Sequence, residues 1–129
     1  MFSIEEIKSA HSKVKSGADF PNYIKELKKL GVMYYETHVS DGHTDYFNIN
    51  NLKISSTASY NTINVNDASN SEQFKTDLIA HQQGKINYFT FCSDTAKSGV
   101  EKWIVNIEKL TCTYYSKSGE EILVEKIPQ

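Results

Sequence analysis

The chain has 129 residues, a net charge of −2 and a hydrophobic fraction of 39%, which is typical of one globular domain. All 14 basic residues are lysine, and arginine is the side chain that binds phosphates and guanine edges bidentately. The composition therefore argues against specific nucleic-acid recognition. No stretch approaches the ~20 apolar residues of a membrane span, so we expect no membrane partner.

The beginning of the sequence and its cysteines indicate a compartment. Residues 1–6 (MFSIEE) are too acidic for a signal peptide. A domain of this size needs no disulfide, so we expect Cys92 and Cys112 to be free thiols in a reducing environment. Together these features predict a cytoplasmic protein.

Two helices are predicted at the start of the chain. Ser3 and Glu6 form a capping box, and Gly17 ends the first helix. Asp19 caps the second helix, which ends at Gly31. The apolar stripe of the first helix consists of Ile4, Ile7, His11 and Val14. That of the second consists of Phe20, Tyr23, Ile24, Leu27 and Leu30.

Three strands follow these helices. Residues 32–40 alternate and are rich in β-formers, and Asp41-Gly42 predicts a two-residue hairpin turn. Residues 43–48 form the return strand, and residues 52–56 form a short third strand. Residues 57–70 are rich in Ser, Thr and Asn, which is typical of a surface connection.

The second half of the chain predicts the same kinds of element. A third helix runs from Ser71 to Gln83, before Gly84, and a fourth from Tyr88 to Ser98, before Gly99. Their inward residues are Phe74, Leu78 and His81 on the third helix, and Tyr88, Phe91, Cys92 and Thr95 on the fourth. Strands are predicted at 100–107, 111–116 and 121–127, with Pro128 after the last, and Trp103 in the core.

A constant offset of 68 residues relates the two halves. It aligns Gly31 with Gly99, Tyr35 with Trp103 and Tyr46 with Tyr114. We predict one α+β domain of two pseudo-repeats, about 1–56 and 71–127, joined by 57–70. Each is helix–helix–strand–strand–strand, and an antiparallel sheet is covered by helices on one face. Chance similarity between two helix-to-strand units is the alternative.

Six segments resemble a family of small bacterial and prophage proteins, the YdfO/YbcV family, loosely labelled phage envelope proteins. They are residues 20–23 (FPNY), 39–44 (VSDGHT), 81–85 (HQQGK), 88–92 (YFTFC), 99–103 (GVEKW) and 111–115 (TCTYY). The resemblance covers essentially the whole chain. It implies an α+β fold and a phage-related setting, and it implies no activity.

A polar group on the first hairpin is one candidate site. A two-residue turn would place His38 opposite Asp45, with Glu36 and His43 on the same face. Two histidines and two carboxylates could bind a divalent metal or supply an acid–base pair. The alternative is a solvated polar face with cross-strand charge pairs.

We nevertheless expect no metal and no cofactor. Neighbouring side chains on a nearly flat strand pair stand roughly parallel, whereas a zinc site needs donors about 2.0–2.2 Å from one point. The hairpin alone would then offer two ligands, His38 and Asp45.

His11 and His81, on the helix stripes, are the other candidates. A stripe histidine is usually a partly buried structural residue, and the alternative is a pocket shared across the pseudo-repeat. Cys92 and Cys112 are expected in the core, and Cys112 would lie opposite Ile107 if the second hairpin follows the first. No catalytic residue is identified, because fingerprints such as Cys-x-x-Cys, Gly-x-Ser-x-Gly or a P-loop do not occur.

These observations predict a cytoplasmic binding or accessory module in a phage-related or stress-related setting. Its partner would be a protein or a small molecule, and it would be a monomer or homodimer. One alternative is an enzyme using His11 or His81, or the face with Glu36, His38, His43 and Asp45. Another is a structural phage component.

Overall fold

The computed structural model describes residues 1–15 and 19–127, which contain four helices and six strands. The helices are α1 (Ile4–His11), α2 (Phe20–Leu30), α3 (Ser71–Gln82) and α4 (Tyr88–Lys97). The strands are β1 (Tyr34–His38), β2 (Thr44–Phe47), β3 (Lys53–Ser55), β4 (Val100–Asn106), β5 (Thr111–Ser116) and β6 (Glu121–Lys126). No helix in these ranges is long and apolar enough to cross a membrane.

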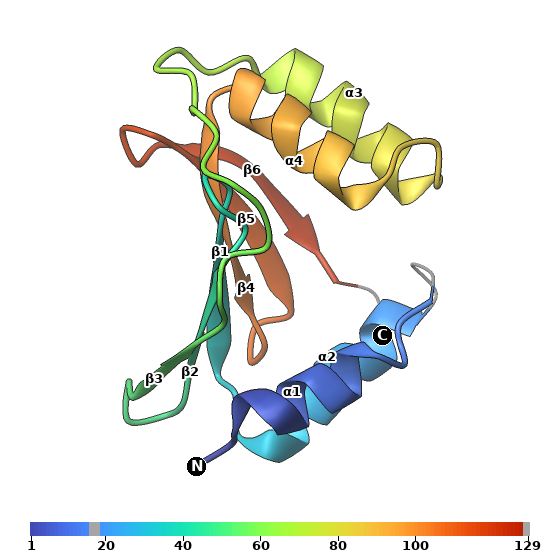
Figure 1. Cartoon of the computed structure of the whole chain (residues 1–129), viewed down its shortest axis with the longest axis vertical. Coiled ribbons are helices and arrows are strands. Elements are labelled where there is room, and N and C mark those ends of the chain that lie inside the picture. The colour runs from blue at the N-terminus through green and yellow to red at the C-terminus, as the bar shows by residue number, and fades with distance from the viewer. Residues whose placement is uncertain (16–18, 128–129) are drawn as a thin grey trace.

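The six strands form one antiparallel sheet in the order β3-β2-β1-β4-β5-β6. Each half contributes a three-strand meander, and β1 and β4 pair in the middle. Both helix pairs lie on the same side of this sheet (Figure 1). Each pair consists of two helices that are consecutive in the chain, α1 with α2 and α3 with α4. The predicted α+β class, with helices over one face, is therefore confirmed.

The halves share their element order and their hairpin register. Tyr35 lies opposite Tyr46, and Trp103 lies opposite Tyr114, so the offset of 68 residues relates both pairs. The ring centroids are 5.5 Å apart in the first pair and 6.0 Å in the second. Duplication itself, and the division at residues 57–70, remain predictions.

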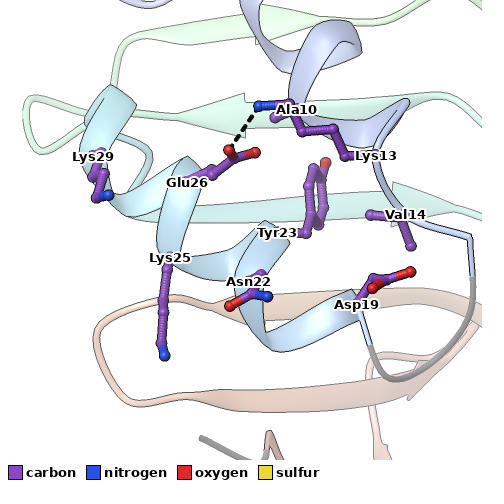
Figure 2. Close-up of a pocket in the computed structure, with 9 residues that line it drawn as sticks. All are labelled: Ala10, Lys13, Val14, Asp19, Asn22, Tyr23, Lys25, Glu26 and Lys29. Atoms are coloured by element: carbon purple, nitrogen blue, oxygen red, sulfur yellow. Dashed lines mark hydrogen bonds and ion pairs between the residues drawn. The ribbon is translucent and has the colours of Figure 1, made fainter.

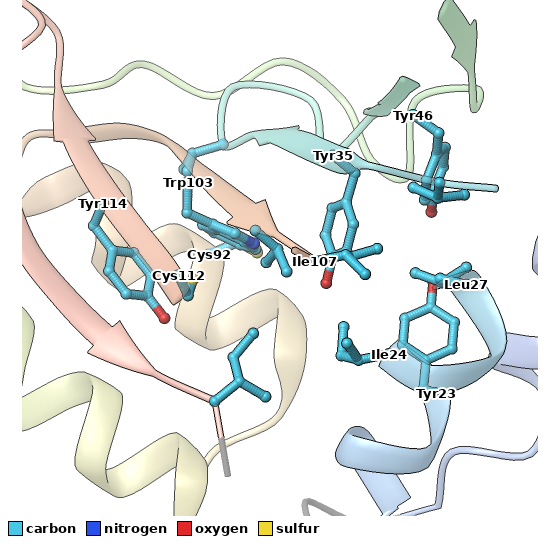
Figure 3. Packing of buried hydrophobic residues seen from close by; sticks show 14 of the residues in the cluster. Tyr23, Ile24, Leu27, Tyr35, Tyr46, Cys92, Trp103, Ile107, Cys112 and Tyr114 are labelled. Carbon is cyan, nitrogen blue, oxygen red and sulfur yellow. The ribbon is translucent and has the colours of Figure 1, made fainter. Parts of the chain in front are cut away.

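The core lies between the sheet and the helices. Aromatic side chains from β1, β2, β4 and β5 point toward α2 and α4 (Figure 3). Trp103 is 9% exposed, close to Phe91 and Tyr114, so its predicted core position is confirmed. Cys92 and Cys112 are both buried and free. Burial raises the pKa of the Cys112 thiol to about 12, which keeps that thiol protonated.

The helices differ from the prediction in one boundary, one cap and the exposure of one side chain. The capping box of Ser3 and Glu6 is present, but α1 ends at His11, because the N–H groups of Lys13 and Val14 form tighter turns to carbonyls three residues back. Asp19 makes no side-chain cap on α2, and its carboxylate accepts the N–H of Lys15 instead. Tyr88, predicted to point inward, is 44% exposed. The proposed stops at Gly17 and Pro128 lie outside the described residues.

The first hairpin has a longer connection than the predicted two-residue turn. Glu36 lies opposite Asp45, and the N–H of His38 donates to the carbonyl of His43. The register is thus two residues from the predicted one. β1 ends at His38, and the N–H of the next residue, buried Val39, donates to the carbonyl of Glu101. The connection to β2 therefore starts earlier along the chain than predicted, at Val39.

The second hairpin is shifted in the same way. Cys112 lies opposite Val105 and not opposite Ile107. A shift of two residues keeps every side chain on its face, because side chains alternate with a period of two. The faces of both hairpins are therefore as predicted, although the pairs across the strands differ.

Candidate functional site

The face of the sheet opposite the helices carries the polar group of the first hairpin. Core residues such as Tyr35 and Tyr46 point toward the helices, so their strand neighbours Glu36 and Asp45 point the other way. His38 and His43 share this open face. We call His38, His43 and Asp45 the histidine–aspartate cluster.

The two histidine rings of the cluster lie directly against each other. Because the register places His38 opposite His43, their ring centroids are 4.3 Å apart and the rings are nearly parallel, at 9°. Under the predicted register His38 would have faced Asp45. The longer turn therefore places the two imidazole rings against each other.

Asp45 is the third member of the cluster and lies close to both histidines. It is only 7% exposed, and its carboxylate oxygens lie 3.1 Å from Nε2 of His38 and 3.6 Å from Nε2 of His43. The hydroxyl of Ser55, on β3, donates to the same carboxylate at 2.6 Å. One ligand atom from each of His38, His43 and Asp45 lies within 4.8 Å of the others. The expectation that the hairpin offers only two ligands is therefore wrong.

A second carboxylate orients His43 from the turn. Asp41 accepts both the backbone N–H of His43, at 3.0 Å, and its ring Nδ1–H, at 2.6 Å. A carboxylate can only accept a hydrogen bond, so this contact assigns the ring proton to Nδ1. The Nε2 atom of His43 faces Asp45 and carries a lone pair only when the ring is neutral.

Both aspartates of the site are held in the ionised form. Burial alone would raise the pKa of Asp45, but the hydrogen bonds from Ser55 and His38 and the nearby histidine charges outweigh it and lower this pKa below its ordinary value. The pKa of Asp41 is also lowered, because two hydrogen bonds from His43 outweigh its desolvation. At neutral pH the cluster therefore contains acceptor carboxylates beside two imidazoles.

Glu36 lies at the rim of the cluster. Its Oε2 is 3.9 Å from Nε2 of His38, and its Oε1 is 4.0 Å from Nζ of Lys102. Lys102 also lies 5.8 Å from the ring centroid of Tyr115. These longer contacts connect the cluster to β4 and β5.

The two helix histidines are not part of this site. His11 is exposed, contrary to the expected partial burial, and meets the edge of Tyr23 on α2 at 5.3 Å. His81 is half-buried as expected, and stacks on Phe91 of α4 at 4.5 Å. Desolvation lowers the pKa of His81. Each histidine thus contacts its own helix pair, and no shared pocket forms from these contacts.

A hollow between α1 and α2 is a separate feature of the described residues. Figure 2 shows it around Tyr23, with charged side chains at its rim. Lys13 and Glu26 form an ion pair of 2.9 Å across it. None of the six candidate residues lines this hollow, nor a second one between α3 and α4. The pockets found and the candidate side chains therefore do not coincide.

Sequence reasoning missed two residues of the site. Asp41 was interpreted only as a turn former, although an Asp two residues before a histidine can bind that residue's backbone N–H. Ser55 gave no local signal, since it reaches Asp45 only through the pairing of β2 with β3.

The fold and the site together define a small α+β domain, with helices over one face of its sheet and a histidine–carboxylate group on the other. The chain belongs to the family described as protein of unknown function DUF1398, whose model matches residues 8–126. A search of curated proteins found no match.

Proposed function

We propose that the protein is a binding or accessory module that recognises its partner with the open face of its sheet, at the histidine–aspartate cluster. The observation that carries this proposal is the convergence of His38 and His43 on a nearly buried, ionised Asp45. An unpaired buried carboxylate is costly, so the hydrogen bonds of Asp45 with His38 and Ser55 hold these side chains in place.

The surroundings of the cluster support binding more than nucleophilic catalysis. Both cysteines are buried on the helix side of the sheet, and the hydroxyl of Ser55 donates to Asp45. The open face also carries Tyr34 stacked on Phe47, at 4.4 Å, and aromatic side chains favour interfaces. We propose a protein or small-molecule partner in a cytoplasmic, phage-related setting, with the protein as a monomer or homodimer.

A second candidate is an enzyme that uses His43 as a general base. The contact between Asp41 and His43 favours it, because a carboxylate on Nδ1 orients an imidazole for proton transfer at Nε2. A structural phage component is a third candidate, supported by the resemblance alone.

A pull-down from the native host tests the proposal. Wild-type protein, His38→Ala, His43→Ala and the helix variant His11→Ala are used as baits, and retained proteins and metabolites are identified by mass spectrometry. We expect a partner that wild type and His11→Ala retain and that the two cluster variants lose. Equal retention by all four baits contradicts the proposed site. A metabolite that is converted during incubation with wild type favours the enzyme.

A further inference from the structure

We propose that His38, His43 and Asp45 form a binding site for a divalent transition-metal ion such as Zn²⁺. This deepens the proposed function and rests on it, since it names the ligand chemistry of the same cluster. The donor set consists of two imidazole nitrogens and one carboxylate oxygen within 4.8 Å of one another. Imidazole donors select ions such as Zn²⁺, whereas Mg²⁺ and Ca²⁺ prefer oxygen ligands alone.

The separations between the donors suit a small ion. Donors about 2.0–2.2 Å from a tetrahedral ion are about 3.4 Å from one another. The Asp45 oxygens are already 3.1 Å and 3.6 Å from the Nε2 atoms of His38 and His43. No pair of the three donor atoms is more than 4.8 Å apart. Movements of the donor atoms on the order of 1 Å, by side-chain rotation, would therefore bring all three within bonding distance of an ion.

Two of the three ligands are held by hydrogen bonds with residues behind them, as metal ligands in proteins commonly are. Asp41 holds Nδ1 of His43 at 2.6 Å, which presents the Nε2 lone pair to the cluster. Ser55 donates to Asp45 at 2.6 Å and fixes its carboxylate. At the third ligand, His38, an ion would replace the proton between Nε2 and Asp45. This exchange requires no change in the backbone. The hairpin therefore prepares two of the three ligands in advance.

The site keeps contact with solvent. The side chains of His38 and His43 are 26% and 29% exposed, whereas Asp45 lies beneath them. Three protein ligands with an open side leave a position for water or for a donor atom of a partner. Such an ion could therefore connect this protein to an anionic or imidazole-bearing partner.

Calorimetric titration of the chelator-treated full-length protein with ZnCl₂ is the first measurement. We expect one site of micromolar affinity or tighter in wild type and in His11→Ala. His38→Ala and His43→Ala should abolish it, and Asp41→Ala should weaken it about 10–100-fold, because it removes only the outer support. Affinity weaker than millimolar in wild type, or unchanged affinity in both cluster variants, overturns the proposal.

A measurement on wild-type protein guards against variants that fail to fold. In a ¹H–¹⁵N spectrum of the imidazole groups, Zn²⁺ should shift the signals of His38 and His43 and leave those of His11 and His81 in place. Shifts confined to His11 or His81 overturn the site. If no ion binds and the cluster variants still lose the partner in the pull-down, the metal site is wrong and the binding face stands. If the ion binds and no partner depends on the cluster, the metal site stands without the proposed partner role.

Discussion

The carboxylate of Asp41 accepts hydrogen bonds from both the backbone and the ring of His43, at 3.0 and 2.6 Å. One turn residue thus fixes the position of a neighbouring residue and the tautomer of its side chain. The remaining ring nitrogen, Nε2, faces Asp45. The geometry of the cluster therefore depends on a residue outside it.

Replacing Asp41 by alanine should release His43. In the neutral form of the His43 ring, we expect wild type to carry the proton on Nδ1 and Asp41→Ala to lose this preference, as measured by ¹⁵N chemical shifts. The free energy of unfolding should fall by about 1–2 kcal/mol, because two donors lose their charged acceptor. The exposed His11 serves as the reference signal. An unchanged His43 tautomer in Asp41→Ala would contradict the assigned role.

Asp45 should make the free energy of unfolding depend on pH. Its pKa is lowered in the folded state, so its stabilising contribution is complete above the unfolded pKa, about 3.9, and is lost as the pH falls through the folded value. Unfolding free energies measured between pH 6 and pH 2 should fall less steeply in Asp45→Asn than in wild type. Ser55→Ala should give an intermediate slope, because it removes one of the hydrogen bonds that lower this pKa. Identical slopes in all three proteins would refute the prediction.

Trp103 should be the most costly side chain to truncate in the second hairpin. It contacts Phe91 and Tyr114 and is 9% exposed, so Trp103→Ala loses burial and leaves a cavity. We expect a loss of about 3–5 kcal/mol in urea denaturation. Ile49→Ala is the control, since Ile49 is 78% exposed and its truncation should be nearly neutral. A loss below about 1 kcal/mol for Trp103→Ala would argue against its place in the core.

Two glycines with similar backbone angles separate strain from crowding. Gly99 and Gly84 have φ values of +78° and +75°. A Cβ on Gly99 would collide with the backbone of Ala68 and Ser69, whereas one on Gly84 would meet no atom within 4 Å. Gly84→Ala should therefore cost about 1–2 kcal/mol from backbone strain alone, and Gly99→Ala distinctly more. Equal thermal and urea midpoints for the two variants would contradict the close approach of residues 57–70 to α4.

Much of the fold follows from local sequence patterns. The alternation in the strands assigned each side chain to its face, and the capping box of Ser3 and Glu6 set the start of α1. Trp103 was recognised as a core residue from its place in an alternating strand. These features depend on neighbours within a few residues, which a single sequence contains. The pseudo-repeat remains a prediction, and superposition of the two halves is its test.

The composition of the candidate site also followed from the sequence, but its geometry did not. Alternation alone placed His38, His43 and Asp45 on one face. Only the tertiary structure decided that the two histidines stand opposite each other, because β1, paired with both β2 and β4, ends at His38 and the turn begins at Val39. Only the pairing of β3 with β2 brings Ser55 to Asp45. Strand register and the contact between Ser55 and Asp45 depend on residues that are far apart in the chain. No local sequence pattern predicts which of these residues pair.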